Sequence, residues 1–327
     1  MQFPLVHVSW ALADNAGRPA CDAFFRDIFG ARTVYEMLIT PETESYGFDR
    51  EESLMLIGDT MVIPIAPAGG GAREGSPLGD MLRRSAAPMR WIGLALKVSD
   101  LAEADAWFAA RGFKRHYDPG METHYFLVPR GQALGVRLEI VRQDMPNDPR
   151  RAPHWRPAAD HPLGIEGLQA VGVSTPSETE ARALFAERLE WPELGTRELP
   201  EGCCTAFAMG DTALEAIAGS PGSAIAEHAA QVKGICHLVF KVRDAAAAAA
   251  WLESRGLPLI GEVSTRFAID PGAAHGRLIW LTQETPPGYP AVGSQVGTIS
   301  PRKVIDRAAF SSARRSAAIP IGDAEVA

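Results

Sequence analysis

The sequence predicts an α+β protein made of four βαβββ modules that pair into two domains. The main observation is an internal repeat: residues 93–112 read GLALKVSDLAEADAWFAARG and residues 237–256 read HLVFKVRDAAAAAAWLESRG, at a constant offset of 144. Self-similarity of this length indicates a duplicated structural unit. A second, shorter repeat relates GDTMVIPIAP at 58–67 to GDTALEAIAG at 210–219. Together with weaker apolar similarity elsewhere, these repeats mark four units that start near residues 5, 91, 166 and 235.

Within a unit, the sequence pattern has the order strand, helix, strand, strand, strand. In the second unit WIGLALKV is an apolar strand, Asp100 is a helix N-cap, and Gly112 ends the helix where a left-handed conformation is needed. Three short strand-like runs follow, FKRHYD, THYFLVP and VRLEIV. The fourth unit repeats this order with a helix from Asp244 to Arg255 and the runs LIGEVS, TRFAID and RLIWLT. The first and third units have helical patterns around 21–29 and 177–189.

The connectors predict where the domains divide. Residues 142–164 are rich in proline, a composition typical of a linker. We therefore expect a first domain at 1–145, with modules near 3–67 and 90–143, and a linker at 146–164. A second domain follows at 165–285, with modules near 165–219 and 233–284. Residues 286–327 are expected to form a C-terminal arm or tail.

Composition limits the partners. The 327 residues carry a formal net charge of −8 and no block of lysine and arginine, so nucleic acid is not an expected partner. There is no signal-peptide pattern and no uncharged apolar run near the roughly 20 residues that span a bilayer. The four cysteines lack metal or redox spacing, which favours reduced thiols and a cytoplasmic location. We expect a monomer or homodimer that acts on a small molecule.

Four such units, each opening with an apolar strand that closes in V-x-D or a variant, resemble the vicinal oxygen chelate (VOC) superfamily. This group includes glyoxalase I, extradiol ring-cleavage dioxygenases and bleomycin-resistance proteins, and the resemblance covers residues 3–285. It implies that two modules pair so that their mixed sheets enclose a cup. It also implies that a metal ion, where one is present, is held by residues early in the first strand and within the last strand of the paired modules. The scaffold alone does not define the reaction, because it hosts enzymes and metal-free binders.

The resemblance carries the metal positions onto eight residues of this chain, of which four have side chains able to bind a divalent ion. The first-strand positions are His7, Gly93, Leu168 and His237, and the last-strand positions are Ile63, Glu139, Glu215 and Ile279 or Trp280. The candidate ligands are therefore two histidines and two glutamates, His7, Glu139, Glu215 and His237. Neither a complete glyoxalase set nor a complete extradiol set is present in the standard positions.

Which ligands meet depends on how the modules pair. Sequential pairing gives each cup one His and one Glu: His7 with Glu139, and Glu215 with His237. Pairing of the outer modules gives one cup with two His and another with two Glu. The proline-rich break lies where a domain boundary belongs, which favours sequential pairing.

The second unit offers further chemistry between residues 116 and 125. His124 is a candidate third metal ligand beside His7 and Glu139, and Glu139, His124 and Tyr125 are the candidate catalytic residues. Alternation puts His124 and Phe126 on one face and Tyr125 and Leu127 on the other, without deciding which face looks into the cup. Trp10, Phe126 and Trp280 are the candidate substrate-binding residues. The competing interpretation of residues 116–125 is an exposed hairpin.

The resemblance implies a metal-dependent enzyme acting on a small oxygenated organic molecule, either dioxygenase-like or a glyoxalase-like lyase or isomerase. The cofactor would be Fe²⁺, Mn²⁺, Zn²⁺ or Ni²⁺. The alternative is a metal-free binding or sequestering protein of the bleomycin-resistance type, because half of the ligand positions are vacant. A third hypothesis is that only one cup is catalytic and the other is a degenerate structural partner.

Overall fold

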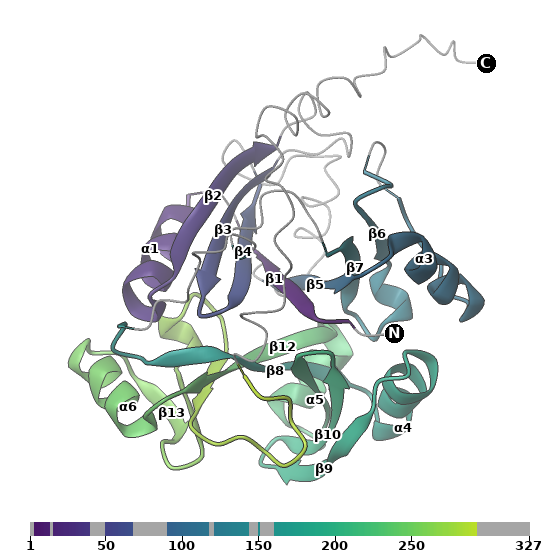
Figure 1. Ribbon diagram of the computed structural model, residues 1–327. Coiled ribbons are helices and arrows are strands. Elements are labelled where there is room, and N and C mark those ends of the chain that lie inside the picture. Colours follow the sequence, from purple (N-terminus) through teal and green to yellow (C-terminus); the bar gives the residue numbers. More distant parts are fainter. Residues whose placement is uncertain are drawn as a thin grey trace.

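The computed structural model describes residues 3–13, 16–39, 50–67, 90–117, 121–143, 150 and 160–292. These residues form two curled mixed sheets, one of seven strands and one of eight, flanked by helices (Figure 1). The α+β class and the four paired modules that the sequence predicts are therefore confirmed. The expectations for the loop at 68–89, most of the linker, and the tail from 293 onward lie outside the described residues.

The seven-stranded sheet has the order β2-β3-β4-β1-β5-β7-β6 and forms the first half of the molecule. Its first module consists of β1 (Leu5–Ala11), α1 (Arg18–Phe29), β2 (Arg32–Ile39), β3 (Arg50–Ile57) and β4 (Thr60–Ala66). Its second module consists of β5 (Arg90–Val98), α3 (Leu101–Ala110), β6 (Tyr125–Val128), a 3₁₀ turn at Arg130–Gln132 and β7 (Arg137–Arg142).

The eight-stranded sheet has the order β13-β14-β15-β12-β8-β11-β10-β9 and forms the second half. Its first module consists of β8 (Ile165–Thr175), α4 (Glu178–Ala181), the π-helix η3 (Arg182–Arg188), β9 (Glu193–Leu199), β10 (Gly202–Met209) and β11 (Thr212–Gly219). After α5 (Ala224–Gln231), the last module consists of β12 (Gly234–Val242), α6 (Ala245–Ser254), β13 (Leu259–Glu262), β14 (Arg266–Ile269), a 3₁₀ turn at Pro271–Ala273 and β15 (Ile279–Thr282).

Strand pairing follows one rule in all four modules. The first strand of each module runs parallel to its last strand, as in β1 with β4 and β12 with β15. The modules then join through their first strands, β1 antiparallel to β5 and β8 antiparallel to β12. Consecutive modules therefore pair, which is the arrangement favoured by the position of the proline-rich break.

The helix boundaries follow the local signals in the sequence. Asp100 accepts a hydrogen bond from the Glu103 backbone N–H, and Asp244 accepts one from Ala247, so both repeated aspartates cap their helices. Two details differ from the prediction. The run FKRHYD gives only an isolated bridge at His116 among the described residues, and helix α5 between the third and fourth modules is not anticipated by the repeat.

A single hydrophobic core joins the two halves. It contains Val8 and Leu138 from the first sheet together with Val171 and Phe240 from the second, along with residues of the flanking helices. One face of each sheet therefore packs toward the other half (Figure 1), and the opposite face of each sheet is called its cup below. None of the helices in the described ranges is long and apolar enough to cross a membrane.

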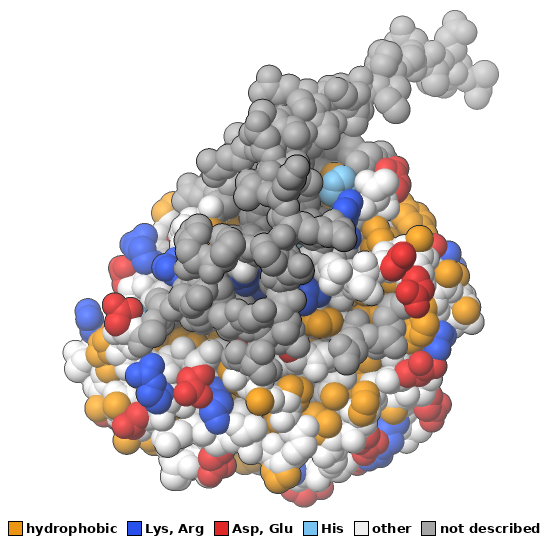
Figure 2. Space-filling view, in the orientation of Figure 1, with side chains coloured by type: hydrophobic (Ala, Val, Ile, Leu, Met, Phe, Trp, Pro, Cys, Tyr) orange, Lys and Arg blue, Asp and Glu red, His pale blue; other side chains and the backbone are white. Residues whose placement is uncertain are grey.

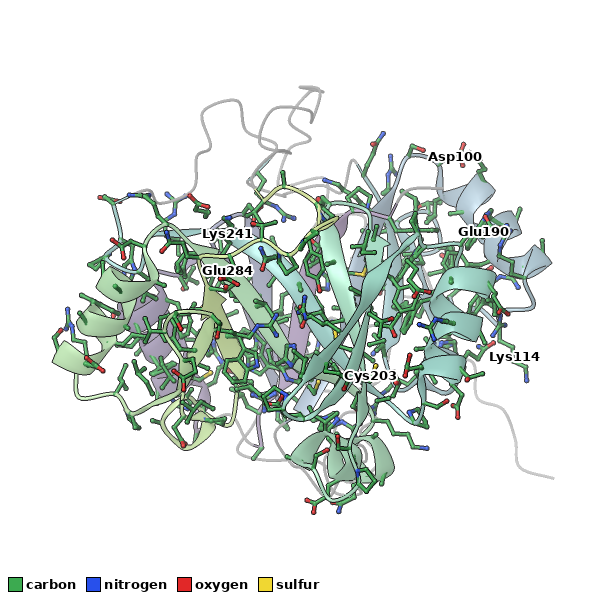
Figure 3. All side chains as sticks on the ribbon, turned by 90° about the horizontal axis from the view of Figure 1, so that it is seen from below. Asp100, Lys114, Glu190, Cys203, Lys241 and Glu284 are labelled. Atoms are coloured by element: carbon green, nitrogen blue, oxygen red, sulfur yellow. The ribbon has the colours of Figure 1, made fainter. Side chains whose placement is uncertain are left out.

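Close backbone contact and charged pairs hold the seam between the halves. A Cβ atom on Gly135 would lie 2.6 Å from the Gly234 nitrogen, so only glycine allows this approach. Arg111 beside α3 pairs with Glu190, which lies after η3 (Figure 3), and Asp211 accepts a hydrogen bond of 2.9 Å from the Leu5 backbone N–H. On the face shown in Figure 2, the basic and acidic side chains of the described residues are interspersed and form no field of one sign.

Candidate functional site

Each cup contains a histidine and a glutamate that meet above a small residue. In the first cup, strand register places His7 of β1 beside Ala95 of β5 and Ala95 beside Glu139 of β7. In the second cup, register places Glu215 of β11 beside Gly172 of β8 and Gly172 beside His237 of β12. The two long side chains reach across the middle strand in both cases because Ala and Gly leave room above it.

The first-cup pair is close and partly open to solvent. His7 Nε2 lies 3.7 Å from Glu139 Oε2, and the two side chains are 16% and 27% exposed. The apolar residues that share this face form a small cluster near the pair: Val6, Ala95, Met121, Tyr125, Leu127 and Val141. The pair thus lies beside a largely buried apolar cluster that includes the aromatic ring of Tyr125.

The other residues expected in the first cup are distributed over both faces of the sheet. Tyr125 lies on the cup face in the apolar cluster beside Glu139. Phe126 lies on the opposite face, with its ring 5.5 Å from that of Phe108 on α3. Trp10 is also on the core side, fully buried between Phe25 and Trp91. Neither aromatic ring therefore lines the cup, because alternation along β1 and β6 turns them toward the helices.

His124 does not join His7 and Glu139. It lies in the turn that precedes β6, where its backbone carbonyl accepts a hydrogen bond from the Arg142 N–H and its Nδ1 lies 3.1 Å from the Thr123 hydroxyl. Among the described residues, no three His, Cys, Asp or Glu side chains are close enough together to hold a metal ion. The structure thus brings together two of the three residues proposed for this set.

In the second cup, Glu215 is fully buried and both of its carboxylate oxygens are occupied. Arg266 donates to the two oxygens at 3.0 and 2.7 Å, and Arg197 donates to Oε1 at 2.7 Å. The Tyr289 hydroxyl donates to Oε1 at 3.0 Å, and His237 Nε2 donates to Oε2 at 3.2 Å. Five donors on a group with about four lone-pair sites leave no direction for a further ligand.

The charges of the second cup follow from this geometry. Burial opposes ionisation of Glu215, but the Arg266 charge and the hydrogen bonds from His237 and Arg266 outweigh it and hold the pKa of Glu215 well below its usual range. Burial lowers the pKa of His237 despite Glu215, which leaves the imidazole neutral. One carboxylate therefore faces two guanidinium groups, and the cluster carries a net positive charge.

Two further features close the second cup. A Cβ atom on Gly172 would lie only 2.2 Å from His237 Nε2, so the ring packs directly on the β8 backbone. Tyr289 belongs to the segment after β15, which crosses the second sheet (Figure 1). Its buried ring packs with Trp280, Val239 and three alanines, and burial raises the pKa of its hydroxyl. Trp280, expected to bind substrate, therefore lines a cup that a tyrosine of the same chain fills.

The resemblance gives Leu168 as the first-strand metal position of the third module, but this residue does not lie on the cup face. Leu168 lies on the core side of β8, and the residues of β8 that lie next to Glu215 and Ala213 of β11 on the cup face are Gly172 and Ala170. Gly172 and Ala170, which take the place of Leu168 on the cup face, also lack side chains that could bind a metal ion.

Several residues of the second cup were not identified from the sequence. Arg197, Arg266 and Tyr289 come from β9, β14 and the segment after β15, outside the strand positions that the resemblance highlights. A signal was present, because RFAI alternates so that Arg266 shares a face with Ala268, opposite Phe267 and Ile269. A largely buried arginine on the inner face of a strand is commonly paired with an acid.

The fit of a divalent metal ion differs between the cups. Ligand atoms at about 2.0–2.2 Å from a metal are about 3–3.5 Å apart, and the 3.7 Å between His7 and Glu139 is near this separation. The first pair thus fits as two ligands of a divalent ion. The second pair does not fit, because Glu215 is saturated and two guanidinium charges face the same space.

Comparison with known structures places the chain in a fold family. A triple mutant of 4-hydroxymandelate synthase from Streptomyces coelicolor aligns with a TM-score of 0.65 and 16% identity, over 92% of this chain and 97% of the other. A halotolerant catechol dioxygenase aligns with a TM-score of 0.54 and 13% identity, over 86% and 87%. The 2,2',3-trihydroxybiphenyl 1,2-dioxygenase of Sphingomonas wittichii strain RW1 gives 0.53 and 12%, over 91% and 94%.

No protein-family model matches the sequence, and no curated protein matches it either. The structural matches cover nearly all of both chains and share the arrangement of two curled mixed sheets. The chain has the fold of the vicinal oxygen chelate superfamily, as its repeats predict.

Proposed function

We propose that this chain is a metal-dependent VOC-type enzyme whose reactive centre is the first cup, where His7 and Glu139 bind a divalent ion and a small oxygenated organic molecule is transformed. The observation that supports this proposal is the 3.7 Å approach of His7 Nε2 to Glu139 Oε2 in a cup that remains partly open to solvent.

The position of the pair suits such a centre. An imidazole and a carboxylate on two rigid strands, separated by Ala95, present a nitrogen and an oxygen donor to the same point. The apolar cluster around Tyr125 and Leu127 would take the hydrocarbon part of a substrate and keep bulk water from that side. Glu139 is placed to accept or return a proton at a substrate carbon or hydroxyl next to the ion.

A bound divalent ion would supply either Lewis acidity toward two neighbouring substrate oxygens or, as Fe²⁺, oxygen activation. The catecholic and phenolic names of the structural neighbours fit the second possibility, and the apolar lining suits aromatic substrates in either case.

The second cup would serve as a structural partner. Its His–Glu pair is engaged with two arginines and Tyr289, so the residues that resemble ligands are used within the chain. This matches the hypothesis of one catalytic cup and one degenerate cup.

One observation favours a second candidate function. In the part of the chain that the structure describes, no third His, Cys, Asp or Glu joins His7 and Glu139. A metal-free protein that binds or sequesters a small apolar molecule in the first cup would need no third ligand.

Metal analysis of the purified protein tests the proposal. Wild type should bind about one equivalent of Fe²⁺, Mn²⁺, Zn²⁺ or Ni²⁺, and His7→Ala and Glu139→Gln should each weaken that binding by about 10-fold or more. His116→Ala is the matched control, because His116 is an exposed histidine of the same half outside the pair. Absence of metal binding in wild type, or equal binding in the two cup variants and the control, would contradict the proposal. The metal-free binding protein would then be the remaining candidate function.

A further inference from the structure

A cavity of about 660 Å³ lies at the seam between the two halves, away from the two His–Glu pairs. Its walls come from the turn before β7, the end of β8, the helical segment α4–η3 and the junction of α5 with β12. Four basic residues line it, Arg90, Arg130, Arg188 and Lys233, and Glu180 is the acidic residue of its lining. The lining thus has a surplus of positive charge.

Neutral acceptors hold the arginines of this cavity in place. Arg130 Nε donates to the Gly135 carbonyl at 2.7 Å, and its Nη2 donates to the carbonyls of Val232 and Lys233. Arg188 Nε donates to the Arg111 carbonyl at 2.9 Å, and its guanidinium lies 3.6 Å from the centre of the Phe113 ring. These contacts fix the side chains without neutralising their charge.

The ion pairs of the described residues include none formed by Arg130, Arg188 or Lys233. Arg130 is half-buried, and this burial lowers the pKa of its guanidinium. Burial, followed by the charge of Arg130, also lowers the pKa of nearby His228 to about 4. An anion in the cavity would compensate the partial burial of the Arg130 guanidinium.

The backbone around the cavity is unusual in two independent places. Leu184 and Arg188 belong to the π-helical run Arg182–Arg188, a rare conformation that is frequently found at functional sites. Lys233 has a φ of 61° at the end of α5, where glycine or asparagine is the usual residue. A lysine at such a position costs about 1 kcal/mol or more.

The cavity also has groups that would orient a ligand. The Ser174 hydroxyl lies 2.7 Å from His228 Nδ1 at its wall, and Leu134 and Leu184 supply apolar surface. Pockets of about 300–1,000 Å³ with mostly apolar walls and a few fixed polar groups are typical of small-molecule sites.

We propose that this seam cavity binds a small organic anion, whose carboxylate or phosphate contacts Arg130, Arg188 and Lys233 while its apolar body lies against Leu134 and Leu184. The ligand would bridge the two halves, because Arg130 belongs to the first half and Lys233 to the second. Its binding would therefore stabilise the fold as well as the site.

Calorimetric titration with benzoate, phenyl phosphate and neutral benzyl alcohol tests this proposal on the full-length protein. At least one of the two anions should bind to wild type and benzyl alcohol should bind more weakly, with affinity falling as salt is added. Preference for benzoate would assign a carboxylate ligand, and preference for phenyl phosphate would assign a phosphate ligand. Failure of both anions to bind at about 10 mM, where a ligand with millimolar Kd saturates, would overturn the proposal.

Variants decide whether binding occurs in this cavity. Arg188→Gln and Lys233→Asn should each weaken anion binding by about 10-fold, the loss of one charge-assisted contact, and asparagine keeps the left-handed backbone accessible. Glu180→Gln should tighten binding, because it removes the acidic residue of the lining. Arg182→Gln is the matched control on the same helix, since Arg182 pairs with Glu178 and Glu193 instead.

Equal affinity in Arg188→Gln, Lys233→Asn and the Arg182→Gln control would place the anion elsewhere and overturn the assignment. His7→Ala separates this inference from the proposed function, because it should weaken metal binding in the first cup and leave anion binding unchanged.

Discussion

The two cups hold the same pair of side chains in two different electrostatic states. In the first cup, His7 and Glu139 meet above Ala95 at 3.7 Å with both side chains partly exposed. In the second cup, His237 and Glu215 meet above Gly172 at 3.2 Å with exposed fractions of 2% and 0%. The residue types therefore do not determine the role of the pair; the surrounding charges and burial do.

The difference shows how a duplicated scaffold can separate two uses of one motif. Arginines on β9 and β14 convert the second pair into part of a buried ion cluster, whose net charge excludes another cation. The first pair keeps access to solvent and lies beside a small apolar cluster. Recognising a ligand pair thus requires the residues on neighbouring strands as well as the pair itself.

Removal of the glutamate should affect the two cups very differently. Glu215→Gln leaves two buried guanidinium groups without a counter-charge and should lower the free energy of unfolding by about 3–5 kcal/mol. Glu139→Gln, in the partly exposed pair, should lower it by about 1 kcal/mol or less. Urea denaturation of the two variants beside wild type measures the contrast. Equal losses would show that the cups are electrostatically alike.

Acid should destabilise the second half through a histidine near its cup. His228 faces Ser174, Arg130 and His237, and burial, followed by Arg130 and His237, lowers its pKa to about 4. In the unfolded chain the His228 imidazole binds a proton near pH 6.5, whereas in the folded chain it stays neutral until about pH 4. The neutral imidazole therefore contributes fully to the free energy of unfolding above pH 6.5, and this contribution is lost as the pH falls toward 4. The free energy of unfolding should fall by at most about 3 kcal/mol through this group.

Denaturation curves at several pH values between 7 and 4.5 measure this loss. His228→Gln should flatten the pH dependence by a large part of that amount. An unchanged pH profile in the variant would assign the acid sensitivity to other groups.

The middle residue of the second cup gives a smaller test. Gly172→Ala places a methyl group 2.2 Å from His237 Nε2, so the ring must move and the hydrogen bond to Glu215 must lengthen. We expect a loss of about 2 kcal/mol. Ala95→Gly in the first cup opens space and should change metal binding little, although it costs about 1 kcal/mol in strand stability. Thermal unfolding with and without metal distinguishes the two.

The sequence predicts the fold well because the repeat states the module order directly. The equivalence of 93–112 and 237–256 places β5 with β12, and Asp100 and Asp244 cap the helices that follow. The caps depend on neighbouring residues only, so local patterns are sufficient. The presence of α5 depends on packing against β8, β11 and β12, and the repeat contains no trace of it.

The candidate site is predictable only in part. The His–Glu pairs follow from module pairing, but the cup-facing residues depend on strand faces. His7 and Trp10 are three positions apart on one strand and so point to opposite sides, an alternation that alone argues against placing both in the cup. Irregular register in β1, between Leu5 and His7 and between Ser9 and Trp10, makes such assignments less secure. Arg197 and Arg266 lie far from Glu215 in sequence, and no local pattern links them.

Because the two halves share one hydrophobic core, the second half stabilises the fold of the first. Because Val8 and Leu138 pack in the same cluster as Val171 and Phe240, neither sheet retains a covered inner face without the other. The protein should therefore unfold cooperatively, as one unit. A substitution that disrupts the ion cluster around Glu215 would lower the fraction of molecules that are folded. It would therefore lower the number of intact first cups, although the substituted residue does not contact that cup. On the proposed function, screens of activity in cells would then register the second cup as essential, while the catalytic constants of the molecules that remain folded would be those of wild type.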